Sequence, residues 1–402
     1  MNLINYLKKN GIKRAVDVFF QYKLEKIIVN FLMVFLRKKP LLDAIVIESH
    51  NDFDCNGGAF YDYLLRNGYN KRYKIVWLLR NKAPRELPEN VVALPLQKPS
   101  LRKCYYICRA KYFTADNQIT RKARPDQLCF FFDHGAVSLK SVRGLYAIPE
   151  SVDYMLSPSE NYDPVIASEY SLTHPDHRFV HPGYPCHDVL YREIPDELEK
   201  VTTKKFSKVY LWMPTFRKGG GYCRNDSTAE FPYGIPLVEN EQMMNELQKF
   251  LEENNSLLVI KVHPMQDPDT LTLLHGSDNI LVLTGQTVKE LGVDNYRLIK
   301  SADALISDYS SIAYSYLLLN RPMAFVLSDL KDYKLGFAMP DPERYLVGEK
   351  IYTFDQFFAF LKDVRDGNDT FKAEREALGK WLFEQHDGNS CQRIAEMMGL
   401  QK

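Results

Sequence analysis

Two short polar stretches of this 402-residue chain combine side chains that could do chemistry on a phosphate ester. His134 follows the apolar run Leu128–Phe132 and Asp133, and Gly135 comes next. An imidazole has an ordinary pKa of about 6.5 and can take a proton from a hydroxyl at neutral pH. Residues 307–311 read SDYSS at the end of another apolar run, where hydroxyls and backbone N–H groups would face an anion at a helix start. These residue types predict activation of a hydroxyl and binding of a phosphate.

Each stretch also has a plainer interpretation. Ser310 or Asp308 could do no more than cap the helix. A histidine at a strand end is often structural or simply exposed, so His134 alone does not establish a base. A third group of side chains, in a Pro-containing loop, has the residue types of a zinc site but no regular ligand spacing, so we predict no metal there. Its members are His174, His177, His181, Cys186 and His187.

The elements around the SDYSS turn indicate a parallel sheet. Ala302–Ile306 has the length and apolar character of a strand, and Ile312–Leu319 can continue as a helix until Asn320, Arg321 and Pro322 end it. Met323–Leu327 is the next strand. Strand, helix and strand in this order build parallel sheets.

The same alternation runs through both halves of the chain. A Lys- and Glu-rich linker from Glu197 to Lys208 separates them, so we predict a prefix at 1–40, a first α/β domain at 41–200 and a second at 201–402. In the first half we expect strands at Asp43–Glu48, Lys74–Leu79, Val91–Leu94, Lys111–Thr114 and Leu128–Phe132 and a helix at Leu101–Arg109. In the second half we expect strands at Val209–Met213 and Leu257–Val262 and a helix at Glu241–Glu253.

Composition excludes some classes of function. The formal net charge of +1 gives no general support for nucleic-acid binding. The seven cysteines form no C-x-x-C pair, which favours reduced thiols in a cytoplasmic protein. No secretory signal peptide is apparent at the N-terminus.

The prefix is basic and partly apolar. Residues 1–39 carry nine Lys and Arg against two acidic residues, and Ile27–Leu36 is nearly all apolar. Ten residues are too few to span a bilayer. An amphipathic helix on an anionic membrane surface fits both facts, and a helix packed on the first domain fits them equally well.

The SDYSS turn, its short helix and the following RPMAFV together resemble the CDP-glycerol glycerophosphotransferase family of teichoic-acid polymerases and primases. The resemblance implies a GT-B fold, with two Rossmann-like domains facing a central cleft. It also implies transfer of an alcohol phosphate from a CDP-activated donor to an acceptor hydroxyl, with release of CMP. Residues 41–394 carry several further motifs of the family in the same order.

These motifs imply roles for individual residues. The family's HGTPLK, PTWR and K-x-H-P segments correspond to the segments that begin at His134, Pro214 and Lys261. Cys186 stands where the family has an Arg, and Ser315 where it has an Asp. By resemblance, His134 and His263 are catalytic, and the donor-binding residues are Gly135, Asp188, Thr215, Arg217, Lys261, Asp308, Ser310, Ser311 and Ser315. The turn at Asp387-Gly388 with Ser390 predicts a helix that closes the second domain.

The expected substrates follow from the resemblance. The expected donor is CDP-glycerol, with CDP-ribitol as the alternative. The expected acceptor is a lipid-linked or saccharide hydroxyl of a teichoic-acid or capsule polymer. No cofactor is required, although Mg²⁺ can accompany the diphosphate. The protein would lie at the inner face of a bacterial membrane, in contact with it through residues 1–39. Two alternatives remain open: a GT-B glycosyltransferase that uses a nucleotide sugar, and a non-catalytic binding protein.

Overall fold

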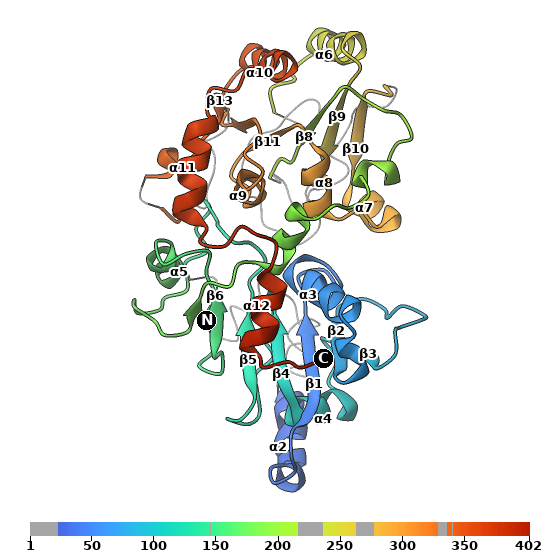
Figure 1. Ribbon diagram of the computed structural model, residues 1–402, viewed down its shortest axis with the longest axis vertical. Helices are drawn as coiled ribbons and strands as arrows, with labels where there is room; N and C mark the ends of the chain where they lie inside the picture. Colours follow the sequence, from blue (N-terminus) through green and yellow to red (C-terminus); the bar gives the residue numbers. More distant parts are fainter. Residues whose placement is uncertain (1–22, 145, 216–235, 263–276, 329–335, 340) are drawn as a thin grey trace, which may run out of the picture.

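The fold contains two β-sheets, each made of parallel strands, which lie one above the other along the long axis of the molecule (Figure 1). The computed structural model describes residues 23–144, 146–215, 236–262, 277–328, 336–339 and 341–402. Each sheet is covered by helices, and the chain passes between the sheets at the η4 turn (Glu197–Lys200) and again after α11 (Lys372–Leu382). The predicted α/β class is confirmed.

The first sheet has the strand order β3-β2-β1-β4-β5-β6-β7, and every neighbouring pair is parallel. Its order reverses between β1 and β4, and ligands of open parallel sheets bind at such a reversal, beyond the carboxyl ends of the strands. The strands are β1 (Leu42–Glu48), β2 (Lys74–Leu79), β3 (Val91–Pro95), β4 (Ala110–Ala115), β5 (Leu128–Phe131), β6 (Tyr154–Leu156) and β7 (Phe179–Val180).

The second sheet has the order β10-β9-β8-β11-β12-β13 and is also parallel throughout. The order reverses between β8 and β11, so the SDYSS turn after β11 lies at the equivalent edge of this sheet. The strands are β8 (Lys208–Trp212), β9 (Ser256–Lys261), β10 (Ile280–Leu283), β11 (Ala304–Ser307), β12 (Met323–Val326) and β13 (Glu349–Ile351).

The central strands are continuous apolar runs because helices cover both faces of each sheet. The predicted helices α4 (Leu101–Arg109) and α6 (Glu241–Glu253) have the predicted limits. The remaining helices are α2 (Glu25–Leu36), α3 (Cys55–Arg66), α5 (Asp163–Glu169), α7 (Gly285–Leu291), α8 (Asn295–Ser301), α9 (Ile312–Leu317), α10 (Phe354–Asp366) and α12 (Ser390–Met397), with short 3-10 turns η2 (Tyr69–Lys71), η3 (Pro185–Tyr191) and η7 (Pro342–Tyr345).

The loop after β1 is short, because α3 already begins at Cys55 and contains both glycines of the CNGG segment. Gly57 N–H donates to both carboxylate oxygens of Asp116, at 3.0 and 2.9 Å. A Cβ on Gly58 would lie 2.4 Å from the carbonyl oxygen of Phe53. The glycines therefore let α3 start close against the preceding loop.

Helix α12 corrects the predicted domain assignment. The sequence predicted that this helix closes the second domain, but it packs against η3 and α3 of the first (Figure 1). The buried carboxylate of Asp188 accepts hydrogen bonds from the N–H groups of Ser390 and Cys391, at 2.8 and 2.9 Å. These are N–H groups that a helix start leaves without intrahelical partners, so Asp188 fixes the helix where it begins.

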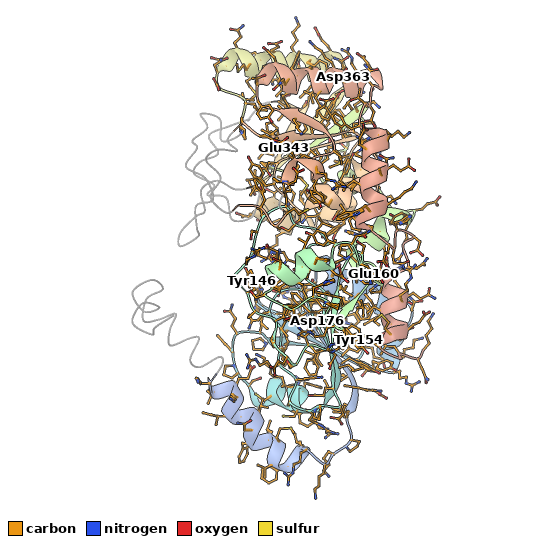
Figure 2. The ribbon with its side chains drawn as sticks, turned by 90° about the vertical axis from the view of Figure 1, so that its left-hand side faces the viewer. Tyr146, Tyr154, Glu160, Asp176, Glu343 and Asp363 are labelled. Carbon is orange, nitrogen blue, oxygen red and sulfur yellow. The ribbon has the colours of Figure 1, made fainter. Side chains whose placement is uncertain are left out.

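Helix α2 packs on α4 with one face only. Lys103 Nζ pairs with the Glu25 carboxylate at 2.5 Å, and Cys108 Sγ lies 3.8 Å from the Val29 carbonyl oxygen. The other face carries four apolar side chains that are 61–67 % exposed: Ile27, Phe31, Val34 and Phe35. The helix lies at the end of the molecule opposite α6 and α10 (Figure 2). Among the described residues, no helix is long and apolar enough to cross a membrane.

The Asp188 contact predicts a large loss of stability on substitution. In Asp188→Ala, two buried N–H groups of α12 lose a charged acceptor, so we expect the free energy of unfolding to fall by about 2–3 kcal/mol. Urea unfolding monitored by circular dichroism measures the change. The exposed Asp341→Ala serves as a control and should unfold like the wild type. A loss below about 0.5 kcal/mol in Asp188→Ala would contradict this role.

Candidate active site

The loop after β5 meets the loop after β11 where the two sheets face each other. A Cβ on Gly135 would lie 3.2 Å from Ser311 Oγ, so only a glycine allows this approach without displacing the serine. The following residues also join the halves, because Ser141 N–H donates to the Gly336 carbonyl at 3.2 Å and Ala338 N–H donates to that of Leu139 at 2.9 Å. The predicted His134 and SDYSS segments therefore come together in space.

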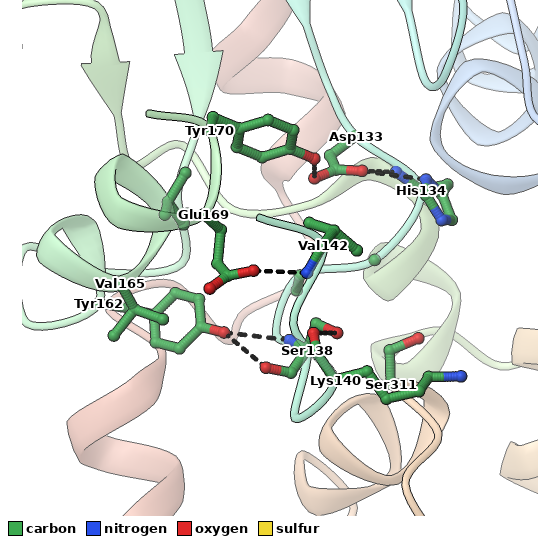
Figure 3. A pocket seen from close by; sticks show the side chains of 13 residues that line it. Asp133, His134, Ser138, Lys140, Val142, Tyr162, Val165, Glu169, Tyr170 and Ser311 are labelled. Carbon is green, nitrogen blue, oxygen red and sulfur yellow. Dashed lines mark hydrogen bonds and ion pairs between the residues drawn. The ribbon is translucent and has the colours of Figure 1, made fainter. Parts of the chain in front are cut away.

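His134 is held at one edge by its neighbour Asp133. The Nδ1 atom of His134 lies 3.0 Å from Asp133 Oδ1, and Tyr170 O–H donates to Asp133 Oδ2 at 2.6 Å (Figure 3). Asp133 has a left-handed backbone, with φ of 60°, and this conformation turns its carboxylate back toward the next residue. A carboxylate on Nδ1 fixes the tautomer and leaves Nε2 as the acceptor of a proton. The His134 side chain is 43 % exposed, so a substrate can reach it.

The pair has a defined electrostatic state. Burial disfavours the His134 imidazolium, but the hydrogen bond and charge of Asp133 outweigh it, so the pKa of His134 is raised. Burial opposes ionisation of Asp133 as well, yet His134 and Tyr170 hold the pKa of that carboxyl below its usual value. The raised pKa of His134 means that its protonation stabilises the fold fully below the unfolded value of about 6.5, and that this contribution is lost as pH rises through the folded value. The lowered pKa of Asp133 means that its ionisation stabilises the fold above the unfolded value of about 3.8, and that this contribution is lost as pH falls through the folded value.

A pocket of about 80 Å³ lies beside this pair (Figure 3). Its wall is held by internal hydrogen bonds: Glu169 accepts from the hydroxyl of Ser141, and the Tyr162 hydroxyl donates to the Ser138 carbonyl at 3.1 Å. The residues that line it are Asp133, His134, Gly135, Ala136, Ser138, Lys140, Val142, Tyr162, Val165, Ile166, Glu169, Tyr170 and Ser311. The pocket thus combines a histidine from the first half of the chain with a serine hydroxyl from the second.

Ser311 begins helix α9, but its side chain makes no capping hydrogen bond. The buried carboxylate of Asp308 accepts from Thr215 N–H at 2.8 Å and from the Thr215 hydroxyl at 2.5 Å. Ser310 is half-buried in the same turn. Asp308 therefore joins the segments that follow β8 and β11, while Ser311 Oγ lies against Gly135, the residue after His134.

Lys261 ends strand β9 as a buried cation. Burial lowers its pKa to about 8, against an opposing effect of the Asp54 charge from the first domain. In the described part of the chain, no carboxylate forms an ion pair with its ammonium. A buried ammonium with this pKa is available to an anionic ligand at neutral pH.

Ser315 and Asp188 lie away from the pocket. The hydroxyl of Ser315 is buried 2.9 Å from His187 Nε2, and burial lowers the pKa of His187 to about 3, so this histidine is neutral. Asp188 holds α12, as described above. Neither residue lines the pocket, and both roles depend on partners that the sequence did not indicate.

The structure also places a residue at the site that the sequence did not single out. The His50 ring, from the loop after β1, stacks on His134 with ring centroids 4.7 Å apart and planes 10° from parallel. In the sequence, His50 is only part of a polar loop after an apolar strand. In the sheet β4 lies between β1 and β5, so the sequence does not indicate that the loops after these two strands meet.

Two predicted site residues, Arg217 and His263, lie outside the described residues. Within the described ranges, no three His, Cys, Asp or Glu side chains are grouped in a way that could hold a metal ion.

The Asp133 contact predicts a change in the titration of His134. Without the carboxylate, burial is no longer offset, so in Asp133→Asn we expect the pKa of His134 to fall below its wild-type value. An NMR titration of ¹³C-labelled histidines measures it, with His134→Ala to assign the signal. Asp176→Asn, beside the exposed His177, should leave that signal unchanged. A His134 pKa that stays constant or rises in Asp133→Asn would refute the pairing.

Comparison with known proteins gives a consistent picture. The teichoic acid ribitol-phosphate polymerase TarK of Staphylococcus aureus is 26 % identical, over 98 % of this chain and 74 % of that protein. The teichoic acid glycerol-phosphate primase of Bacillus subtilis is 23 % identical, over 72 % of this chain and 75 % of that protein. The structure of the wall teichoic acid polymerase TagF superimposes with a TM-score of 0.73 at 18 % identity, covering 99 % of this chain and 98 % of that one.

The TagF likeness confirms the predicted GT-B type of fold. Residues 29–399 match the model of the family described as CDP-glycerol:poly(glycerophosphate) glycerophosphotransferase. This match covers both sheets and all the motifs on which the predicted resemblance depended. The chain belongs to the CDP-glycerol:poly(glycerophosphate) glycerophosphotransferase family.

Proposed function

We propose that this protein is a transferase that moves an alditol phosphate from a CDP-activated donor to an acceptor hydroxyl and releases CMP, in teichoic-acid synthesis. The observation that supports it most is the Asp133–His134 pair, which faces Ser311 of the second sheet beside one pocket. The family and its relatives supply the donor and the type of polymer.

The proposed reaction uses His134 as a general base. Its Nε2 takes the proton of the acceptor hydroxyl while Asp133 holds Nδ1 and stabilises the imidazolium that forms. The hydroxyl oxygen attacks the β-phosphorus of the donor in line, a new P–O bond forms, and the bond between this phosphorus and the CMP oxygen breaks. CMP leaves with the electron pair of that bond. Positioning and charge stabilisation supply most of the catalysis in phosphoryl transfer, so no covalent intermediate is needed.

The donor diphosphate would lie on the side of the second sheet. Ser311 offers a hydroxyl there, and the buried Lys261 offers a cation. For His263 and Arg217 we keep the roles of charge stabilisation and phosphate binding on the sequence motifs alone. We also propose that any Mg²⁺ that takes part arrives with the diphosphate, because the described residues group no set of metal ligands.

The transferred alcohol is proposed to be glycerol phosphate, with ribitol phosphate as the alternative. Relatives named for each alcohol match the chain over most of its length. Ser315 stands at the family's Asp position, but its hydroxyl is engaged by His187. The acceptor hydroxyl would belong to a lipid-linked or saccharide chain of a teichoic-acid or capsule polymer.

We propose that α2 places the enzyme on the inner face of the cell membrane. Its outer apolar face, defined by Ile27, Phe31, Val34 and Phe35, is flanked by Lys23, Lys26 and the cluster Arg37-Lys38-Lys39. Apolar side chains beside cations suit the headgroup region of an anionic bilayer. Because α2 precedes β1 and the site follows it, the length of β1 separates them by about 20 Å. A lipid-linked acceptor would therefore reach the site through an extended headgroup or polymer.

The nucleotide that is released tests the reaction. With CDP-glycerol, CDP-ribitol and a lipid-linked acceptor, the wild type should release CMP, and His134→Ala should be slower by about 100-fold or more because the base is absent. Mass spectrometry identifies the nucleotide and the alcohol transferred. His177→Ala removes an exposed histidine and should leave the rate unchanged.

Release of UDP, GDP or CDP from a nucleotide sugar would favour the glycosyltransferase alternative. Transfer by His134→Ala at the wild-type rate would remove the proposed base but keep the reaction. No turnover of any donor would favour the binding-protein alternative.

The membrane contact predicts a loss of vesicle binding when the apolar face becomes polar. Phe31→Ser with Phe35→Ser removes two exposed rings whose centroids lie 5.5 Å apart, and we expect binding to phosphatidylglycerol vesicles to weaken about tenfold or more. Sedimentation with vesicles measures the bound fraction. Tyr352→Ser, which removes an aromatic ring that is 47 % exposed in the second half, should bind like the wild type. Equal binding of the double variant would exclude α2 as the contact.

A further inference from the structure

His50 and His134 form a close parallel stack, although they come from different loops. The ring centroids are 4.7 Å apart and the planes differ by 10°. Asp133 restrains His134 at the edge of its ring, through Nδ1, whereas His50 covers one face. A contact at one edge still lets a ring tilt, and a flat neighbour on its face prevents that motion.

The loop that carries His50 is fixed by several contacts. Arg80 Nε donates to the His50 carbonyl at 3.2 Å, and its guanidinium also pairs with Glu48. The Asp52 carboxylate accepts from the N–H groups of Arg80 and Asn81, at 2.8 Å each. The His50 carbonyl and the side chains on both sides of it are therefore tied to Arg80 and Asn81, directly after β2.

The same loop holds strained backbone. Asp52, Phe53 and Cys55 have positive φ values of 47°, 62° and 53°, which side-chain-bearing residues rarely adopt. Such conformations persist only where the surroundings enforce them, and they concentrate at functional sites. The Phe53 ring packs on Trp77 with centroids 4.6 Å apart, and Cys55 Sγ lies 3.5 Å from the His134 carbonyl oxygen. The loop is thus built against the segment that carries His134.

The His50 ring is neutral and has no hydrogen-bonding role of its own at Nδ1. Burial, followed by the charges of His134 and Arg80, lowers the pKa of His50 to about 4. Its Nδ1 is buried without a hydrogen-bond partner in the described part of the chain. A buried polar atom without a partner costs stability, so packing alone does not account for a histidine here.

We propose that His50 is a positioning residue that holds the plane of the His134 imidazole through ring stacking. This inference rests on the proposed transferase reaction, in which His134 is the base. With Asp133 at the edge and His50 on the face, Nε2 of His134 points in one direction. The neutral partner also lets His134 take up a proton without repulsion between two cations.

The stack has a consequence for the titration of His134. Beside His50, the charged groups that act on the two rings are Asp133, Glu48 and Arg80. Removal of the His50 ring admits water to one face of His134 and reduces the burial that disfavours its imidazolium. The pKa of His134 should therefore rise in His50→Ala, and a phenyl ring in its place should prevent the rise.

Two substitutions test the proposal. In His50→Ala we expect kcat to fall about 10-fold to 100-fold with KM within about twofold, because the base is present but poorly aimed. The acid limb of the pH–rate profile should move to higher pH. His50→Phe keeps a flat ring and should retain most of the activity with the wild-type profile. His177→Ala is the matched histidine control, with a side chain that is 93 % exposed.

The outcomes separate this proposal from the proposed function. If His50→Ala has wild-type kcat and pH profile, the stack is not needed. If His50→Phe is as slow as His50→Ala although both unfold at the wild-type temperature, a ring nitrogen is needed and the positioning role is wrong. If the wild type releases no CMP, the proposed function fails. The pKa of His134, measured by NMR titration without substrate, still tests the His50 stack. A His134 pKa that is equal in the wild type and His50→Ala would overturn the stack.

Discussion

The close approach of Gly135 to Ser311 is the contact on which the proposed site depends. It joins the loop after β5 of one sheet to the turn after β11 of the other, and a single added methyl group would lie 3.2 Å from the serine oxygen. Hydrogen bonds between residues 139–141 and residues 336–338, which follow β12, also join the two halves of the chain. The proposed base from one domain and a hydroxyl from the other therefore line one pocket without a rearrangement of either sheet.

Unfavourable backbone conformations on the first-domain side are offset by contacts that serve the site. Asp133 has a φ of 60°, and conformations of this kind cost about 1–3 kcal/mol. The ion pair with His134 and the hydrogen bond from Tyr170 oppose that cost. The loop that contains Asp52 and Phe53 shows the same balance between positive φ and multiple hydrogen bonds. Asp133 directly precedes His134, and the loop of Asp52 and Phe53 lies against it through His50 and Cys55.

The local sequence pattern was sufficient to predict most strands and helices of the fold. Buried parallel strands are continuous apolar runs, and helices such as α6 have clear start and end signals. His134 was predictable for the same reason, since it follows such a strand directly. The His50 stack was not, because β4 lies between the two strands concerned and only the sheet order brings their loops together. The Asp188–Ser390 and Ser315–His187 contacts join residues far apart in sequence, so no local sequence pattern predicts them. Asp133 was adjacent to His134 in the sequence, but its role required the left-handed backbone.

The return of α12 to the first domain has a consequence for how the protein is made. Asp188 and its partners Ser390 and Cys391 are separated by the whole second sheet. At elongation rates of about 5–20 residues per second, the ribosome exposes the first sheet for on the order of ten seconds or more before α12 emerges. During this interval the surface of α3 and η3 on which α12 packs is exposed to solvent. The first domain therefore cannot finish folding until the second has been translated. The first domain is thus synthesised before the second but completes its folding only after the second has been made.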